Sequence, residues 1–148
     1  MSTSSSVIFQ SDDGKGGENY KGIIVNFDGY PSGVGKRLRR LVTEHGVDVV
    51  REKLLEHPDW RAIDPETNHN RVDERFHEAA VLGWGEYYYT DTKPDDYLLP
   101  YIDPSWRNEH VYLVSVSGTV LWARSPQEAW LDVEWRDDWS DEGEDDNA

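Results

Sequence analysis

The densest cluster of residue types that could bind a ligand is the run from Phe27 to Lys36, which reads F-D-G-Y-P-S-G-V-G-K. Three further cations, Arg37, Arg39 and Arg40, follow within four residues. Glycines let a backbone approach a bound group closely, and the N-terminus of a helix attracts anions. Basic residues in a first helical turn oppose the helix dipole, so they invite an explanation. The segment predicts either a site for a small anion such as a nucleotide, or cations that stay solvated or pair with a carboxylate or the acidic tail.

This run does not match the phosphate-binding loop of nucleotide hydrolases, which requires G-x-x-x-x-G-K-[ST]. Tyr30 stands where the first glycine would be, and Arg37 replaces the hydroxyl residue that would bind Mg²⁺. Hydrolase chemistry is therefore not predicted here. The segment still supplies most of the predicted ligand-binding or partner-binding residues, which are Asp28, Gly29, Tyr30, Gly33, Gly35, Lys36, Arg37 and Arg40.

A second candidate surface is aromatic, because residues 83–89 read G-W-G-E-Y-Y-Y. In a strand, Tyr87 and Tyr89 lie on one face and Tyr88 on the other. One face would then belong to the core and the other to a recognition surface, or the sheet would simply bury one aromatic side. We add Trp84 and Tyr88 to the predicted partner-binding residues.

Patterns for catalysis and metal binding are weak. The chain has no cysteine, which excludes disulfides, thiolate zinc sites and thiol nucleophiles. His69 and His77 lie near Asp73 and Glu74, but no H-E-x-x-H spacing and no G-x-S-x-G motif occurs. The sequence therefore predicts a non-enzymatic protein with no cofactor and no bound metal.

Charge sets further limits on the partners. Thirty acidic residues against 15 lysines and arginines give the chain a net charge of −15. From Asp132 to the end, nine acidic residues face one arginine, so this stretch alone contributes −8. Such a chain is repelled by nucleic-acid backbones and by anionic membranes, so we expect neither as a partner. An acidic mimic of nucleic acid is a further alternative. No apolar run approaches the length of a membrane span, and with the lack of cysteine this predicts a cytoplasmic location.

The run from Phe27 to Lys36 resembles a segment of the type [F/W]-D-G-Y-P-x-G-V-G-K in small uncharacterised proteins of bacteriophages and bacteria. The likeness covers Ile23 to Leu41 and, more loosely, residues 111–122. It implies a shared strand-turn-helix substructure and a phage or prophage setting, and it transfers no catalytic residue. Together with the weak catalytic patterns, it leads us to expect a phage-encoded interaction protein that acts on a host protein or defence component.

Hydrophobic patterns predict the elements that position these residues. Lys21–Phe27 is β-branched and aromatic, as in a strand, and glycines and a proline follow it. Apolar residues at helical spacing predict one helix from Val34 that Gly46 ends and a second that Pro58 ends. Farther along we expect a surface loop at 60–70, a stretch at 71–80 that is ambiguous between helix and strand, a strand at 81–90 and a loop at 93–108. Strands at 110–116 and 119–124 should form a hairpin around the turn Ser117-Gly118. A capped helix is expected to start at 125–128.

The order of these elements, with two helices after one strand and then mostly strands, predicts the α+β class. We expect an antiparallel sheet with two or three helices packed on one face. The predicted organisation is a flexible leader at 1–19, in which 7–10 form at most an edge strand, a single domain at 20–136 and a disordered acidic tail at 137–148.

Overall fold

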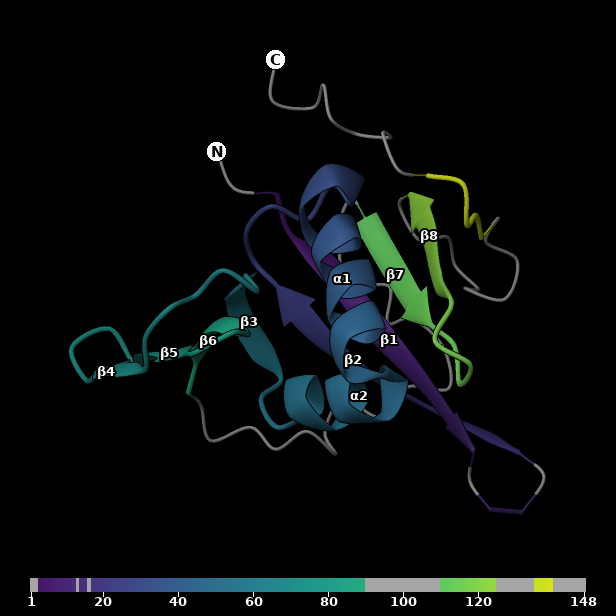
Figure 1. Ribbon diagram of the computed structural model, residues 1–148, viewed down its shortest axis with the longest axis horizontal. Helices are drawn as coiled ribbons and strands as arrows, with labels where there is room; N and C mark the ends of the chain where they lie inside the picture. Colours follow the sequence, from purple (N-terminus) through teal and green to yellow (C-terminus); the bar gives the residue numbers. More distant parts are fainter. Residues whose placement is uncertain (1–2, 13, 16, 90–109, 125–134, 140–148) are drawn as a thin grey trace.

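The computed structural model describes residues 3–12, 14–15, 17–89, 110–124 and 135–139 of the 148-residue chain. Within these residues, eight strands form one sheet and two α-helices follow its second strand (Figure 1). The strand order is β4-β5-β6-β3-β2-β1-β7-β8. The predicted α+β class is confirmed. The sheet is mixed rather than antiparallel throughout, because β1 pairs with β7 and β2 pairs with β3 in parallel.

The N-terminal strand lies inside the sheet. β1 (Ser5–Asp12) pairs with β2 (Glu18–Val25) on one side and with β7 (His110–Val114) on the other. Every residue of β1 from Ser5 to Phe9 is buried. The predicted flexible leader is therefore wrong for Ser5–Asp12, and the predicted edge strand is an internal one. Its serines and aspartate are typical of a polar leader, whereas the strand lies between two others and its apolar residues Val7, Ile8 and Phe9 pack into the core.

Two parallel strands need a crossover, and here the helices provide it. After β2, a π-helical turn, η1 (Pro31–Gly35), leads directly into α1 (Lys36–His45). Gly46, with φ +87°, separates α1 from α2 (Val47–Leu55), and the chain then returns as β3 (Asp59–Ile63). The predicted strand, both helices and the glycine between them are confirmed.

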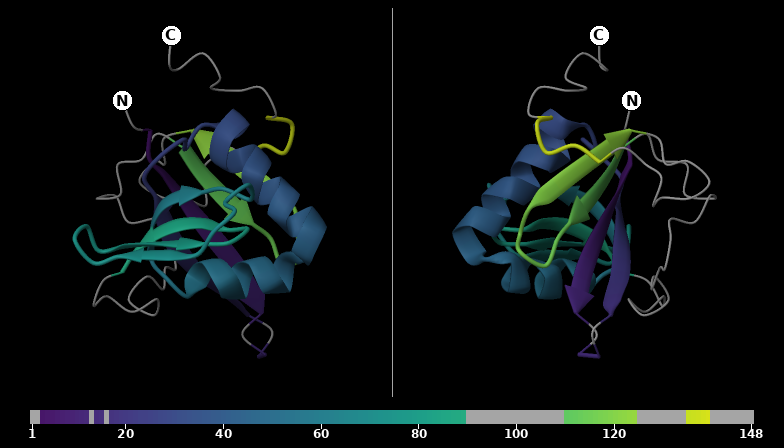
Figure 2. Two further views of the ribbon diagram at one scale, coloured as in Figure 1. Left: turned by 60° about the vertical axis from the view of Figure 1, so that its left-hand side comes forward. Right: turned by 90° about the vertical axis from the view of Figure 1, so that its right-hand side faces the viewer.

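The core consists of two clusters. The larger one joins the helix residues Leu38, Leu41, Val50 and Leu54 to strand residues such as Phe9 and Ile23, and to the buried aromatic residues Trp60, Tyr112, Trp122 and Trp139. Figure 2 shows α1 and α2 running across this side of the central strands. The smaller cluster consists of Ile8, Val111 and Leu113, with Tyr20, Leu121 and Trp135 packed against it. Alternate residues of β1 thus enter different clusters, as the period of a strand requires.

The predicted loop at 60–70 is wrong for its first residues, because Asp59–Ile63 is β3. Trp60 is fully buried, and its indole N–H donates to the carbonyl of Leu54 at 2.9 Å. A register shift between Trp60 and Ala62, where β3 pairs with β6, interrupts the alternation that would have revealed a strand.

Residues 71–88 form three short antiparallel strands, β4 (Arg71–Asp73), β5 (Glu78–Val81) and β6 (Gly85–Tyr88). The ambiguous stretch at 71–80 is therefore a hairpin. Gly85 has φ +132°, and a Cβ atom there would overlap the carbonyl oxygen of Ala62. This glycine lets β6 lie close against β3. In Figures 1 and 2, β4 and β5 project away from the helices.

The predicted hairpin at 110–124 is confirmed as β7 and β8 (Val120–Arg124). Beyond it, Trp139 is completely buried, so the predicted disordered tail is wrong at that residue. The predicted helix start at 125–128 and the chain from residue 140 onward lie outside the described residues. Among the described residues, no helix is long and apolar enough to cross a membrane.

Candidate functional site

The backbone bends after β2, as the sequence predicts, but chain segments fill the bend. Asp28 has φ +58°, a conformation that aspartate tolerates better than most residues. Its carbonyl accepts the N–H of Val34 at 2.8 Å. The N–H of Gly29 donates to the carbonyl of Thr3 at 2.8 Å, and the carbonyl of Gly29 accepts the buried hydroxyl of Tyr112 at 2.6 Å. These bonds tie the bend to the N-terminal segment and to β7.

The glycines of the bend allow close packing within the chain. Gly29, Gly33 and Gly35 are all buried. An added Cβ atom would meet the backbone of Ser4 at Gly29, the carbonyl of Asp28 at Gly33, and the ring of Trp139 at Gly35. The space that these glycines leave is therefore occupied by protein atoms rather than open to a ligand.

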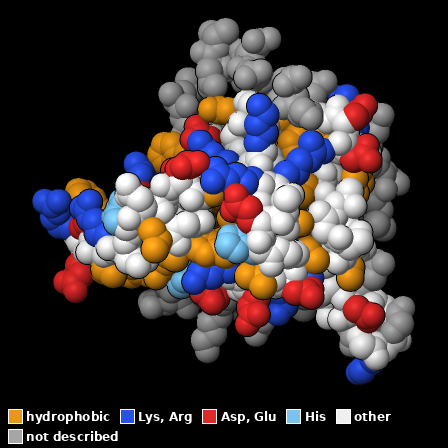
Figure 3. Space-filling view, viewed as in Figure 1, with side chains coloured by type: hydrophobic (Ala, Val, Ile, Leu, Met, Phe, Trp, Pro, Cys, Tyr) orange, Lys and Arg blue, Asp and Glu red, His pale blue; other side chains and the backbone are white. Residues whose placement is uncertain are grey.

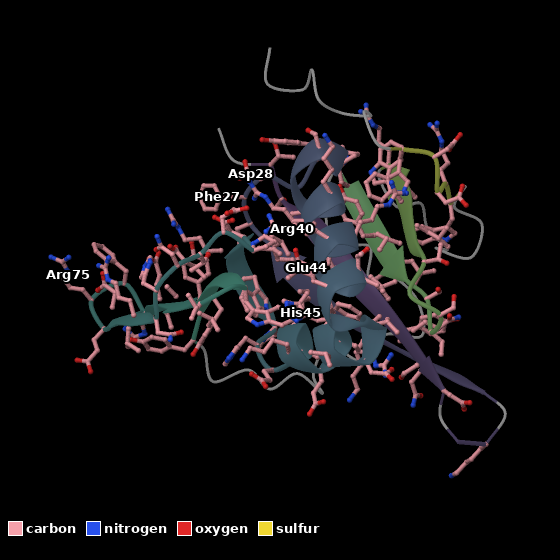
Figure 4. All side chains as sticks on the ribbon, in the orientation of Figure 1. Phe27, Asp28, Arg40, Glu44, His45 and Arg75 are labelled. Atoms are coloured by element: carbon pink, nitrogen blue, oxygen red, sulfur yellow. The ribbon has the colours of Figure 1, made fainter. Side chains whose placement is uncertain are left out.

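Most of the cations next to the bend have partners within the chain. The guanidinium of Arg37 donates to the carboxylate of Asp28 at 3.2 Å and to the carbonyl of Ile63 at 3.1 Å. Arg40 donates to Glu44 at 2.9 Å and to Glu66 at 2.6 Å. These two carboxylates raise the pKa of Arg40 above its ordinary value. Figure 4 shows Arg40 and Glu44 together on α1, with Asp28 near the start of the helix.

The third cation holds the C-terminal segment. The guanidinium carbon of Arg39 lies 3.6 Å from the centre of the Trp139 ring, and Arg39 also donates to the carbonyl of Asp137. Lys36 is exposed at the start of α1. The sequence left open whether these cations bind an anion or pair within the chain. In the structure, Arg37, Arg39 and Arg40 have partners within the chain, and an anion would have to compete with those partners.

The predicted aromatic residues do not join this segment in one surface. Trp84 is half-buried and stacks on His45 of α1, with ring centres 4.7 Å apart. Tyr88 lies beside Arg61 and Glu78, and burial raises its pKa. Its neighbour Tyr87 packs against the core and stacks on His57. Tyr87 and Tyr88 thus lie on different faces, as predicted, whereas Tyr89 follows the end of β6 and stacks on His77. The predicted aromatic residues and the glycine-rich bend do not form one site.

Sequence reasoning missed a different surface, which we call the arm and define as residues 71–82. Five large hydrophobic residues are exposed in the described part of the chain, and three of them lie in the arm: Val72, Phe76 and Leu82, which are 66, 59 and 54% exposed. The other two, Val49 and Val116, are far from each other in the chain. Exposed apolar residues that gather on one element mark interaction sites more often than isolated ones do.

The tip of the arm is held in a defined shape. The carboxylate of Asp73 accepts the backbone N–H of Arg75 at 3.0 Å and the guanidinium of Arg71 at 3.1 Å. His77 has φ +54°, and its ring stacks on Tyr89. These contacts order the turn between β4 and β5, so its side chains are presented in a fixed arrangement.

Arginine and aromatic side chains meet at this tip. The guanidinium of Arg75 lies 4.8 Å from the centre of the Phe76 ring, within the range of a cation–π contact. Figure 4 shows Arg75 at the far end of the arm, and Figure 3 shows basic and hydrophobic side chains side by side there. Arginine and aromatic residues are enriched in protein interfaces, whereas lysine and glutamate are depleted.

A polar pocket of about 160 Å³ lies beside the arm. Arg61 donates to Glu86 at 2.7 Å and lies 3.7 Å from Glu78, and Arg71 and Asp73 also line the pocket. Its charges are thus balanced by ion pairs within the pocket. The described residues contain no group of three or more histidine or acidic side chains that could hold a metal ion.

Comparison with known proteins gives no further guide to the site. No protein-family model, no curated protein and no solved structure matches this chain.

Proposed function

We propose that this chain is a non-enzymatic binding protein that contacts another protein through the apolar and arginine side chains of the arm. The observation that carries the proposal is the exposure of Val72, Phe76 and Leu82 in the arm, at the end of the sheet that projects away from the helices. A monomer gains no stability from large apolar side chains held in water, so their presence on an ordered element favours a role in contact.

The energetics of burial support this use of Phe76. Its side chain is 59% exposed, and a phenylalanine buries an area on the order of 200 Å² when it is fully enclosed. Covering the exposed part would therefore contribute about 3 kcal/mol. Interface residues of this kind, close to an arginine, dominate the binding energy of many complexes.

The resemblance of residues 27–36 to phage and bacterial proteins supports a bacterial host protein, met in the cytoplasm, as the partner that we propose. Arg37, Arg39 and Arg40 of α1 have intramolecular partners, and no observation favours an anion as the ligand. The acidic surface keeps the chain soluble and biases it toward a partner with basic residues around an apolar contact.

Site-specific crosslinking tests this proposal. A photoreactive phenylalanine analogue is placed at Phe76, and at Val49 of α2 as a matched control on an exposed apolar residue. After irradiation in a bacterial host lysate, we expect discrete adducts from position 76 and not from position 49. The substitution Leu82→Ser should weaken those adducts, since it removes another exposed apolar side chain of the arm without touching the crosslinker. Equal labelling from both positions, or adducts that Leu82→Ser leaves unchanged, would refute the proposal.

A further inference from the structure

We infer that β4 is a self-pairing edge, at which two copies of this chain associate by antiparallel pairing of β4 with β4 about Val72. This inference goes beyond the proposed function, because it concerns the backbone edge of the sheet rather than the apolar side chains at the tip of the arm. Its partner is a second copy of the chain.

The two edge strands of the sheet, β8 and β4, differ in their backbone pairing. Beside β8, the backbone of Arg136 exchanges two hydrogen bonds with Trp122, at 2.7 and 2.8 Å, which covers that edge at one point. At the other end of the strand order, β4 pairs with β5 alone among the described residues. An uncovered edge strand presents backbone groups that another strand can pair with.

The alternation of hydrogen bonds along β5 shows which backbone N–H and carbonyl groups of β4 point away from the sheet. The N–H of Tyr89 donates to the carbonyl of His77 at 3.0 Å, so His77, and with it Ala79, faces β6. Because successive residues of a strand direct their backbone groups to opposite sides, Glu78 and Ala80 face β4. Val72 is opposite Ala79, and its N–H and carbonyl therefore point away from β5, toward the open edge.

The charges of β4 select one pairing. Within one copy, Arg71 pairs with Asp73 at 3.1 Å. In an antiparallel pair centred on Val72, Arg71 also lies opposite Asp73 of the second copy, and this contact occurs twice because the arrangement has twofold symmetry. Val72 lies opposite Val72 of the second copy. Opposite charges that face each other across strands are favourable, whereas like charges are not. Parallel pairing in register would place Arg71 against Arg71 and Asp73 against Asp73, which disfavours it.

The contact is small, so the dimer should be weak. Stable interfaces bury about 1,600 Å² in total, and a three-residue strand with one exposed valine covers much less. The net charge of −15 on each copy also opposes association, although 0.15 M salt screens exposed charges beyond about 8 Å. We expect a dissociation constant on the order of 100 µM.

Sedimentation equilibrium on the full chain between 20 µM and 1 mM, in 0.15 M NaCl, tests this inference. The wild-type chain should rise in mean mass from monomer toward dimer across this range. Val72→Pro removes the outward N–H without removing a bond to β5, and proline is tolerated on edge strands. This variant should stay monomeric, and a wild-type-like spectrum of amide resonances outside the arm will establish that it is folded.

A second pair of variants tests the charge contacts at equal net charge. Arg71→Asp gives β4 an acidic residue at both positions 71 and 73, and these face the same two acidic residues of the second copy. The variant should therefore raise the dissociation constant at least about tenfold. Lys36→Asp makes the same charge change on an exposed residue at the start of α1 and should leave the dissociation constant within a factor of about two. A wild-type chain that remains monomeric at 1 mM, or equal effects of Arg71→Asp and Lys36→Asp, would overturn the inference. The crosslinks from position 76 would be unaffected by that result, so the two proposals can fail separately.

Discussion

Trp139 fills the space that a side chain at Gly35 would need. A Cβ atom at Gly35 would overlap the six-membered ring of Trp139, which is completely buried. The indole N–H donates to the carbonyl of Val120 at 3.1 Å, and Tyr112 meets the indole edge to face. Trp139 is therefore enclosed by η1, β7 and β8. The last described residue of the chain completes the core beside the glycine-rich bend.

The contact between these two residues predicts a strong effect of Gly35→Ala. The added methyl group would force Trp139 to move, and overpacking of this kind costs about 1–3 kcal/mol. Urea denaturation should show the loss in the free energy of unfolding. Trp139→Ala should cost about 3–5 kcal/mol by leaving a cavity. In the double variant, the Gly35→Ala penalty should nearly vanish, and a fully additive double variant would contradict the contact.

The hydroxyl of Tyr112 predicts a second, smaller effect. Tyr112→Phe removes the hydroxyl that donates to the carbonyl of Gly29 and keeps the ring that packs in the core. A buried acceptor left without its donor costs about 1–3 kcal/mol. Thermal unfolding should show this loss, together with faster amide exchange near Gly29. Replacement of the half-exposed Tyr20 by phenylalanine serves as the comparison and should cost less.

Arg37 should stabilise the fold more through its hydrogen bond to the carbonyl of Ile63 than through its ion pair with Asp28. Asp28→Asn keeps an acceptor and tolerates the positive φ of that position, so it should cost less than about 1 kcal/mol. Arg37→Met keeps the apolar stem but leaves the carbonyl of Ile63 without this donor, and it should cost about 1–2 kcal/mol. Chemical denaturation of both variants measures the difference. A larger loss for Asp28→Asn than for Arg37→Met would reverse the assignment.

His57 should make stability depend on pH. Burial lowers its pKa below 6.5, with Glu56 opposing that shift and Lys53 adding to it, and its ring stacks on Tyr87 with centres 3.5 Å apart. As the pH falls below 6.5, the unfolded chain binds a proton at His57 before the folded chain does. The free energy of unfolding therefore carries the full His57 contribution above pH 6.5 and falls below it.

The variant His57→Gln isolates this contribution. Denaturation at pH 7.5 and at pH 5.5 should show a smaller loss of stability on acidification than in the wild-type chain. His69→Gln replaces an exposed histidine and serves as the control, with a pH dependence close to that of the wild type. If His57→Gln keeps the whole pH dependence, the half-buried imidazole of His57 is not its source.

Local signals explain which parts of the fold could be predicted. The helix before Gly46 and the hairpin of β7 and β8 have complete patterns within a few residues, and both predictions are confirmed. β1 lacks such a pattern, because Ser5 and Ser6 are buried by strands that are distant in sequence. Trp139 sits in an acidic stretch whose composition gives no sign of burial. These placements depend on tertiary contacts, which a local reading cannot supply.

The candidate site was harder to predict for the same reason. The glycines and arginines of residues 27–40 gave the strongest local signal, yet the structure uses Gly35 and Arg37 to hold the chain together. Exposure, which marks Phe76 and Val72 as candidates, is a property of the folded molecule alone. The local pattern was misleading, because Val72, Phe76 and Ala79 fall at the i, i+4 and i+7 spacing of a helix, whereas the structure forms a hairpin there.

The position of β1 between β2 and β7 affects how the protein is made. A ribosome releases β1 early, but the strand that pairs with its other side begins at His110, about 100 residues later. At roughly 5–20 residues per second, the nascent chain waits on the order of 5–20 s with that side of β1 unpaired. The apolar residues Val7, Ile8 and Phe9 are then open to chaperones or to neighbouring chains on the same messenger RNA. Slower translation of the intervening segment would lengthen this interval and lower the yield of folded protein.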